Sequence, residues 1–203
     1  TVPGTYADLE LADLVVLTGS NLAWCHPVLY QRISAAKQSR PDMKIVVIDP
    51  RRTMTCDIAD MHLAVRADGD AALFNGLLAH LADTGAIDTA YIDAHTRGFA
   101  QAVASARALS PAGLVDATGL SRQDLADFYG LFARTEKVVT CYSQGVNQSS
   151  VGSDKVNAIL NCHLATGRIG RPGMGPFSLT GQPNAMGGRE TGGLANMLAA
   201  HMD

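Results

Sequence analysis

The fold is decided by residues 13–37, which read DLVVLTGSNLAWCHPVLYQRISAAK. Residues 13–19 are a short β-branched, apolar run that ends in glycine, which is typical of a buried strand. Residues 26–37 follow with Pro27 near the start of a helical segment, where proline is favoured. A strand, a turn and a helix in this order indicate one unit of a parallel α/β sheet.

The same order recurs along the chain. Further strands are predicted at KIVVID (44–49), HLAVRA (62–67) and KVVTCYS (137–143). Helices are predicted over residues 71–84, 122–134 and 154–166, and the Ala-rich residues 86–120 predict one or two short helices. The expected N-caps are Asp70, Ser121 with Asp124 in a capping box, and Ser153, while Gly85 and Gly167 end two of the helices.

These elements predict an α/β fold, namely a Rossmann-like parallel sheet with helices on both faces. We expect this domain to cover residues 1–180, and residues 181–203 to begin a return into a neighbouring domain. The 47% hydrophobic and 17% charged composition fits a chain that buries part of its surface against something else. Because the first residue is Thr1 and not Met, we expect a piece excised from a longer protein.

Charge and cysteine spacing exclude several classes of function. A net charge of -3 gives no basic surface, so nucleic acid is not an expected partner. No apolar run is long enough to span a bilayer, and no secretory leader precedes the first strand. The cysteines lack CxxC spacing, so this chain alone is not expected to ligate a metal, and scattered thiols favour a reducing cytoplasm; they are Cys25, Cys56, Cys141 and Cys162.

Polar, glycine-containing loops follow the predicted strands. The carboxyl ends of parallel strands meet at one edge of a sheet, where turns present backbone amides to anionic ligands. Four such loops therefore indicate a large nucleotide-like ligand. The residues concerned are Gly19, Ser20 and Asn21; Asp49, Arg51 and Arg52; Asp68 and Asp70; and Gln144, Asn147 and Gln148.

Plainer interpretations exist for these residues. Asp70 taken alone is more often a helix cap, and Arg51 or Arg52 is compatible with simple solvation. Trp24 is more often a core or interface aromatic than a stacking platform. The histidines show no metal-ligand spacing. The segment GQPNAMGGRETGG (181–193), with five glycines in thirteen residues, fits either a linker or a backbone that passes close to a ligand.

Taken in order, the motifs GSN, IDPRRT, RADGD, QGVNQ and HLATGRIGRPGMGPFSLTGQPNAMGGRE resemble those of molybdopterin oxidoreductases of the dimethyl sulfoxide reductase type. These enzymes hold molybdenum between two molybdopterin guanine dinucleotides. The resemblance covers essentially the whole chain. Within the family, the segments GSNLAWCHPVLYQR and FSLTGQPNAMGGRE are most similar to bacterial assimilatory nitrate reductases.

The resemblance implies roles for individual residues. Arg189 is the candidate nitrate-binding group, because a guanidinium offers forked donors that match two nitrate oxygens. Gln144 shares the catalytic pocket with it and stands where periplasmic relatives usually carry Met. Gln144 and Gln148 are expected on the pterin side. The remaining implied cofactor contacts are Gly19, Ser20, Asn21, Leu22, Ala23 and Trp24; Asp49, Pro50, Arg51 and Arg52; and Asp68, Gly69 and Asp70.

The implied parent enzyme reduces nitrate to nitrite by oxygen-atom transfer to molybdenum. Its [4Fe-4S] centre and its molybdenum-ligating cysteine are not in this chain, so the isolated chain is expected to be inactive. The implied partners are nitrate, the remaining domains of the parent, and an electron donor that is a ferredoxin, a flavodoxin or an NADH-dependent protein. The implied location is the cytoplasm, and no membrane is an implied partner.

Three other interpretations stay open. One is a different oxidoreductase of the same family, such as a formate dehydrogenase. An NAD-dependent dehydrogenase is another, although the first strand lacks the GxGxxG fingerprint that such enzymes carry. A non-catalytic nucleotide-binding module is the third.

Overall fold

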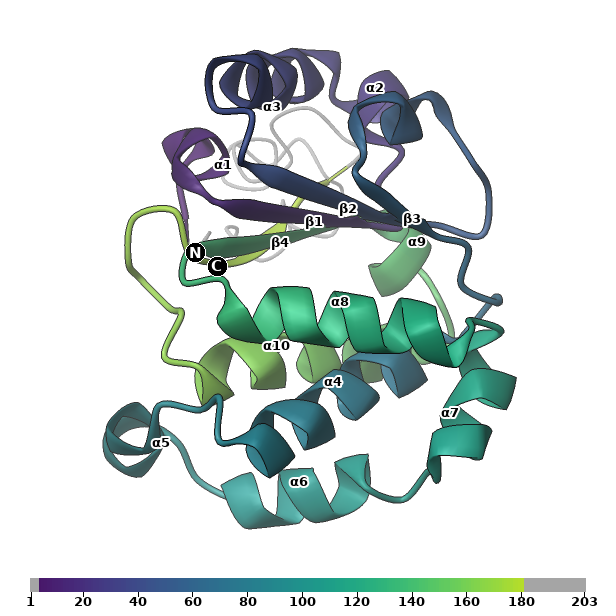
Figure 1. Ribbon diagram of the computed structural model, residues 1–203, viewed down its shortest axis with the longest axis vertical. Helices are drawn as coiled ribbons and strands as arrows, with labels where there is room; N and C mark the ends of the chain where they lie inside the picture. Colours follow the sequence, from purple (N-terminus) through teal and green to yellow (C-terminus); the bar gives the residue numbers. More distant parts are fainter. Residues whose placement is uncertain (1–3, 181–203) are drawn as a thin grey trace, which may run out of the picture.

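The computed structural model describes residues 4–180, and its centre is a five-stranded sheet in which every neighbouring pair is parallel (Figure 1). The strand order is β3-β2-β1-β4-β5. The predicted fold class is confirmed. The strands are β1 (Leu14–Thr18), β2 (Lys44–Ile48), β3 (Met61–Leu63), β4 (Val138–Tyr142) and β5 (Gly175–Ser178).

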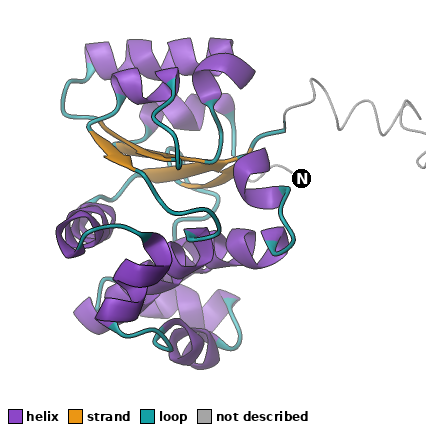
Figure 2. Cartoon of the chain, turned by 90° about the vertical axis from the view of Figure 1, so that its right-hand side faces the viewer, coloured by secondary structure: helices purple, strands orange, loops and turns teal. Residues whose placement is uncertain are grey.

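Helices cover both faces of the sheet (Figures 1 and 2). One face carries α1 (Tyr6–Leu11), α2 (Leu22–Cys25) and α3 (Pro27–Ser39), with the 3-10 helix η1 (Met54–Ile58) beside α2. The other face carries α4 (Asp70–Thr84), α8 (Arg122–Arg134), α9 (Gln144–Asn147) and α10 (Gly152–Ala165). Beyond α4 lie α5 (Thr89–His95), α6 (Phe99–Ala106) and α7 (Pro111–Thr118).

The alternating side chains of β1 divide the core into two halves. Leu14 and Val16 pack with residues of α4, α8 and α10, whereas Val15 and Leu17 pack with residues of α1 and α3. All five residues of β1 are buried, as are all five of β4. A strand buried on both faces carries mostly apolar side chains, and Thr18 and Thr140 are the polar residues within β1 and β4.

Two local predictions are wrong at the helix starts. The N-cap of α4 is Gly69, and Asp70 is its first helical residue because its carboxylate binds Lys155 instead of capping the helix. The helix α10 is capped by Val151 and not by Ser153, since the helix begins at Gly152. The capping box of Ser121 and Asp124 is confirmed.

The chain also contains elements that the sequence did not predict. Residues 86–120 form three helices, not one or two, and α1, α2, α9, η1 and β5 were not predicted. The strand β5 reads GPFS, and its glycine and proline argue against a strand. It is tolerated because β5 lies at the edge of the sheet, where a missing backbone donor costs no ladder bond.

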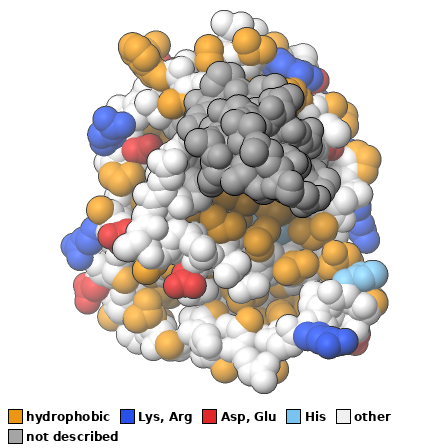
Figure 3. Space-filling view, turned by 180° about the vertical axis from the view of Figure 1, so that it is seen from behind, with side chains coloured by type: hydrophobic (Ala, Val, Ile, Leu, Met, Phe, Trp, Pro, Cys, Tyr) orange, Lys and Arg blue, Asp and Glu red, His pale blue; other side chains and the backbone are white. Residues whose placement is uncertain are grey.

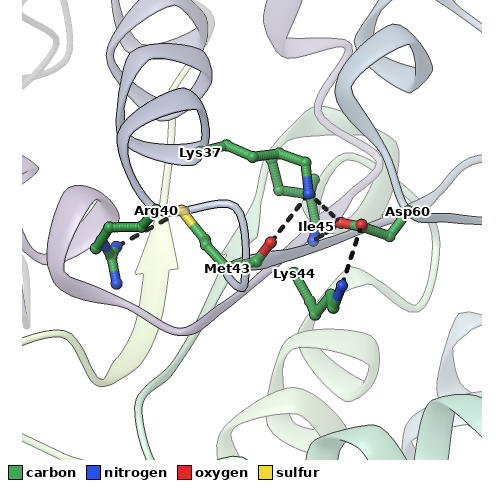
Figure 4. A network of polar contacts seen from close by, with 6 residues as sticks. All are labelled: Lys37, Arg40, Met43, Lys44, Ile45 and Asp60. Atoms are coloured by element: carbon green, nitrogen blue, oxygen red, sulfur yellow. Dashed lines mark hydrogen bonds and ion pairs between the residues drawn. The ribbon is translucent and has the colours of Figure 1, made fainter.

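At the amino end of β2, Asp60 joins the strand to α3 (Figure 4). Its carboxylate accepts hydrogen bonds from Lys37 Nζ at 2.6 Å and from the Ile45 amide at 2.8 Å. Burial alone would raise the pKa of Asp60, but these bonds and the charge of Lys44 lower it below its usual value. This network lies at the amino ends of the strands, opposite the loops that follow their carboxyl ends.

Candidate functional site

The candidate site is the carboxyl edge of the sheet, at the point where the chain changes direction. From β1 the chain continues to β2 on one side, while β4 lies on the other side of β1. The loops that follow β1 and β4 therefore lead to opposite faces of the sheet. In parallel α/β sheets this switch point opens the crevice in which ligands bind.

Two glycines meet at this switch point. The Gly145 amide donates a hydrogen bond to the Gly19 carbonyl oxygen at 2.9 Å. A Cβ atom on Gly145 would lie 2.7 Å from the Gly19 Cα, and one on Gly19 would lie 2.8 Å from the Gly145 carbonyl carbon. No side chain fits at either position, so the two loops meet backbone to backbone at the switch point.

The β1 loop has an unusual backbone. Gly19 and Asn21 both lie in the left-handed region, with φ of 55° and 39°. Ala23 is tied to the neighbouring loop, because its amide donates to Thr55 Oγ1 at 3.1 Å. Leu22 is fully buried in the core, whereas Trp24 is 70% exposed.

After β2, Asp49 stabilises its own turn. Its buried carboxylate accepts a hydrogen bond from the Arg51 amide at 2.8 Å, and its carbonyl oxygen contacts His62 Nε2 at 3.0 Å. Arg51 and Arg52 are exposed, and within residues 4–180 neither side chain forms an ion pair. The loop thus presents two guanidinium groups beside one fixed carboxylate.

After β3, a buried lysine joins two carboxylates. Lys155 is 2% exposed, and its Nζ lies 2.8 Å from Asp68 Oδ1 and 3.0 Å from Asp70 Oδ2. Burial lowers the pKa of Lys155, but the two carboxylates outweigh it and the net shift is upward, so the ammonium stays charged. Sequence reasoning missed Lys155, since a single lysine in a helix is usually solvated.

After β4, Ser143 connects the loop to the end of β5. Its hydroxyl donates to the Leu179 carbonyl oxygen at 2.8 Å and also contacts the side-chain amide of Gln144. Gln144 is half-buried in the first turn of α9, and Gln148 is exposed just after that helix. Ser143 was also missed, because a serine before a polar loop carries no distinctive signal.

Several buried polar atoms near this edge have no partner within the described part of the chain. They are Thr18 Oγ1, Asn21 Oδ1, His26 Nδ1 and Thr53 Oγ1, and all four lie at or just beyond the ends of β1 and β2. Buried polar groups are nearly always hydrogen-bonded in folded proteins. Their concentration here fits a ligand that carries many hydrogen-bonding groups.

Other parts of the described chain contain fewer groups that are suited to binding a ligand or a metal ion. Among residues 4–180 no group of three His, Cys, Asp or Glu side chains is arranged to hold a metal ion. Burial raises the pKa of the Cys141 and Cys162 thiols. A separate pocket between α4, α5, α6 and α10 contains none of the predicted site residues. Apolar side chains also gather on the face of the molecule that is seen in Figure 3.

The profile of the molybdopterin oxidoreductase family matches residues 4–201. The chain belongs to this family. Among molybdopterin oxidoreductases, the nitrate reductase of Klebsiella oxytoca is 56% identical over 202 residues, which are 100% of this chain and 23% of that protein. The assimilatory nitrate reductase catalytic subunit of Bacillus subtilis is 32% identical, over 96% of this chain and 27% of that subunit.

The structural comparison agrees on the fold. The acetylene hydratase of Pelobacter acetylenicus superposes with a TM-score of 0.70 at 21% identity, over 81% of this chain and 22% of that chain. The chain thus spans roughly a quarter of the length of each of these proteins.

The predicted residues of the four loops lie at one edge of the sheet, as the parallel strand order requires. Arg189 and the segment GQPNAMGGRETGG lie outside the described residues, as does the predicted return into a neighbouring domain over residues 181–203. Among the described residues, no helix has the length and apolar character needed to cross a membrane.

Proposed function

We propose that this chain is the main cofactor-binding part of a longer molybdenum nitrate reductase, called the full-length enzyme below. Family membership and the named nitrate reductases support the proposal. The observation that carries it is the contact of Gly19 with Gly145, which leaves bare backbone at the switch point. A large cofactor needs bare backbone there, because its phosphates must approach backbone amides closely.

The cofactor form that we propose is molybdenum bis(molybdopterin guanine dinucleotide). Residues 19–24 would contact the pyrophosphate, and Asp49 with Pro50, Arg51 and Arg52 would bind the nucleotide end. Asp68, Gly69 and Asp70 would contact the guanosine. Gln144 and Gln148 would face the pterin. The unpartnered Thr18, Asn21 and Thr53 oxygens supply further acceptors for its many N–H groups.

When bound, this cofactor would supply the two-electron chemistry that converts nitrate to nitrite and water. The residues of the chain orient the reactants. We assign Arg189 to nitrate, because a planar guanidinium can donate to two oxygens of a planar anion at once. Gln144 would line the same pocket. A [4Fe-4S] centre in the remainder of the full-length enzyme would deliver electrons from a ferredoxin, flavodoxin or NADH-dependent donor.

We infer that the enzyme works in the cytoplasm, with no membrane and no nucleic acid as partner. The four cysteines are free thiols, and three of them are buried. A reducing compartment suits this state.

The test is nitrate reduction by the full-length enzyme with a reduced viologen donor, measured together with molybdenum content. We expect nitrite formation in proportion to molybdenum, and none from the 203-residue chain alone. In the full-length enzyme, Arg189→Lys should raise the nitrate KM and lower kcat while molybdenum content stays at the wild-type level.

Arg171→Lys is the matched control, because Arg171 is exposed and precedes β5. It should leave both constants unchanged. Formate oxidation without nitrate reduction would assign the enzyme to another reaction of the family. Wild-type constants in Arg189→Lys at full molybdenum content would make Arg189 structural.

A further inference from the structure

The ends of β1 and β5 are joined across β4 by one hydrogen bond. His26, which follows α2, places its Nε2 atom 2.6 Å from the carbonyl oxygen of Thr180. The carbonyl only accepts, so Nε2 must carry the proton. In the sheet β4 lies between β1 and β5, so the chain after β5 leans over the carboxyl end of β4 toward the β1 loop.

The preceding peptide group is held from the other loop. Ser143 Oγ lies 2.8 Å from the Leu179 carbonyl oxygen, and the Leu179 amide donates to the Tyr142 carbonyl oxygen at 2.8 Å. The carbonyl group of residue 179 is therefore held by the loop after β4, and the carbonyl group of residue 180 is held by the loop after β1. These are the two loops that meet at the Gly19 and Gly145 contact.

The single hydroxyl proton of Ser143 also orients Gln144. Ser143 contacts both the Leu179 carbonyl and the Gln144 amide, yet a serine has one proton to donate. Both neighbouring atoms, the Leu179 carbonyl oxygen and Gln144 Oε1, are acceptors, so they share this proton and the hydroxyl ties Gln144 to the end of β5.

We propose that His26 is a positioning residue for substrate binding. Together with Ser143 it sets the point and direction in which the chain leaves the sheet edge, immediately before the glycine-rich segment 181–193 that carries Arg189. The bond to Thr180 therefore holds the last described residue before that segment. The inference rests on the proposed role of Arg189 in nitrate binding.

The test compares His26→Leu with His26→Gln in the full-length enzyme. The Leu side chain cannot donate, whereas the Gln Nε2 reaches about as far as the imidazole Nε2 and can restore the bond to Thr180. We expect His26→Leu to raise the nitrate KM about five- to tenfold, the effect of losing roughly one hydrogen bond, with kcat changed less and molybdenum content at the wild-type level. His26→Gln should recover most of the wild-type KM.

A second measurement reports on the anchor itself. In hydrogen exchange of the full-length enzyme, peptides that contain residues 175–180 should exchange faster in His26→Leu than in the wild type, and His26→Gln should restore protection. His95→Leu is the matched control, because His95 is an exposed histidine at the end of α5, a helix that lies beyond α4 from the sheet (Figure 1). It should change neither the KM nor this exchange.

The outcomes separate this inference from the proposed function. An unchanged KM and unchanged exchange in His26→Leu, alongside a raised KM in Arg189→Lys, overturns the role of His26 alone. A wild-type KM in Arg189→Lys overturns the proposed role of Arg189. Loss of molybdenum from His26→Leu makes His26 a cofactor contact and not a positioning residue. If His26→Leu does not fold, His26→Asn replaces it, because its shorter amide cannot reach Thr180.

Discussion

The Gly145 amide donates to the Gly19 carbonyl oxygen at 2.9 Å and thereby joins the ends of β4 and β1. The bond links two loops that are separated by more than a hundred residues of sequence. Because the loops lead to helices on opposite faces, the contact fixes the separation of the two loops at the switch point. It also explains why each loop has a glycine at this position, since a Cβ on either residue would overlap the other backbone.

We expect Gly145→Ala to open this contact. The new Cβ would lie 2.7 Å from the Gly19 Cα, and because both neighbours are backbone, the loops must move apart. The substitution should destabilise the chain by about 1–3 kcal/mol, as overpacking in a tight core does, and the full-length enzyme should retain less molybdenum after dialysis. Urea unfolding of the chain and elemental analysis of the full-length enzyme measure the two effects.

Gly130→Ala is the matched control for this substitution. Gly130 lies inside α8, where a Cβ would meet only the flexible end of Arg134, at 3.3 Å. Alanine is favoured over glycine in a helix by about 0.5–1 kcal/mol, so this variant should be slightly more stable and keep its molybdenum. If Gly145→Ala behaves like Gly130→Ala, the glycine contact does not shape the site.

The strands β1, β2 and β4 could be predicted because each is buried on both faces over most of its length and is made largely of apolar residues. The same rule fails for β5, whose Gly175 and Pro176 resemble a turn. It overextends β3, which ends at Leu63 while the predicted run continues to residue 67. Local pattern thus identifies the centre of the sheet better than its edges, where burial is one-sided and pairing is weaker.

The loops of the candidate site could be predicted from chain order, but their contacts could not. Parallel strands place their carboxyl ends at one edge whatever the side chains are, so Gly19, Asp49 and Gln144 were expected there. The pairing of Lys155 with Asp68 spans 87 residues, and the bond of His26 to Thr180 spans 154. No local pattern encodes such distances, because they follow from how α10 and β5 pack against the rest of the fold.

Acid should destabilise the chain through His163. This histidine is fully buried, and burial together with the charge of Arg168 lowers its pKa from 6.5 to about 3. The unfolded chain therefore binds a proton below pH 6.5 that the folded chain does not. The contribution of neutral His163 to the free energy of unfolding is fully present above that pH. It is lost as the pH falls toward 3, by about 1.4 kcal/mol per pH unit for one proton.

His163→Gln isolates this effect, because its amide can keep the contact with Thr140 Oγ1, at 2.8 Å from Nε2 in the wild type, without taking up a proton. Urea unfolding of the chain at a series of pH values from about 7 down to about 4.5 should show a steeper decline for the wild type than for the variant. Parallel curves would mean that His163 is accessible to protons in the folded chain.

Asp49 should contribute to cofactor retention through its charge as well as its turn. Asp49→Asn keeps a side-chain oxygen for the Arg51 amide, whereas Asp49→Ala loses both the turn bond and the charge. In the full-length enzyme we expect both variants to lose cofactor on dialysis, since a charge-assisted hydrogen bond contributes about 1.5–3 kcal/mol. Molybdenum and pterin content are the measurements. Wild-type content in Asp49→Asn would limit Asp49 to shaping its loop.

Lys155 should matter more than any exposed ion pair. Lys155→Met leaves the carboxylate of Asp70, which is 7% exposed, without its cation. Breaking a buried pair by removing one partner costs about 3–5 kcal/mol, because the other charge stays buried and unpaired. The carboxylates raise the pKa of Lys155 above 10.5 in the folded chain. The contribution of its charge to the free energy of unfolding is therefore complete below pH 10.5, and it is lost only as the pH rises past the pKa of Lys155 in the folded chain.

Two comparisons make the Lys155 prediction specific. Arg107→Met breaks an ion pair with Asp83 in which both side chains are more than half exposed, and it should cost under about 1 kcal/mol. The double variant Lys155→Met with Asp70→Asn removes the buried charge along with its partner, so it should recover part of the stability lost in Lys155→Met, measured by urea unfolding of the chain at neutral pH. If the double variant is as unstable as the sum of the two single variants, Asp70 is not left unpaired in Lys155→Met and water must reach it. In that case the packing of α10 on α4, and not the ion pair, holds Asp68 and Asp70 at the carboxyl edge of the sheet.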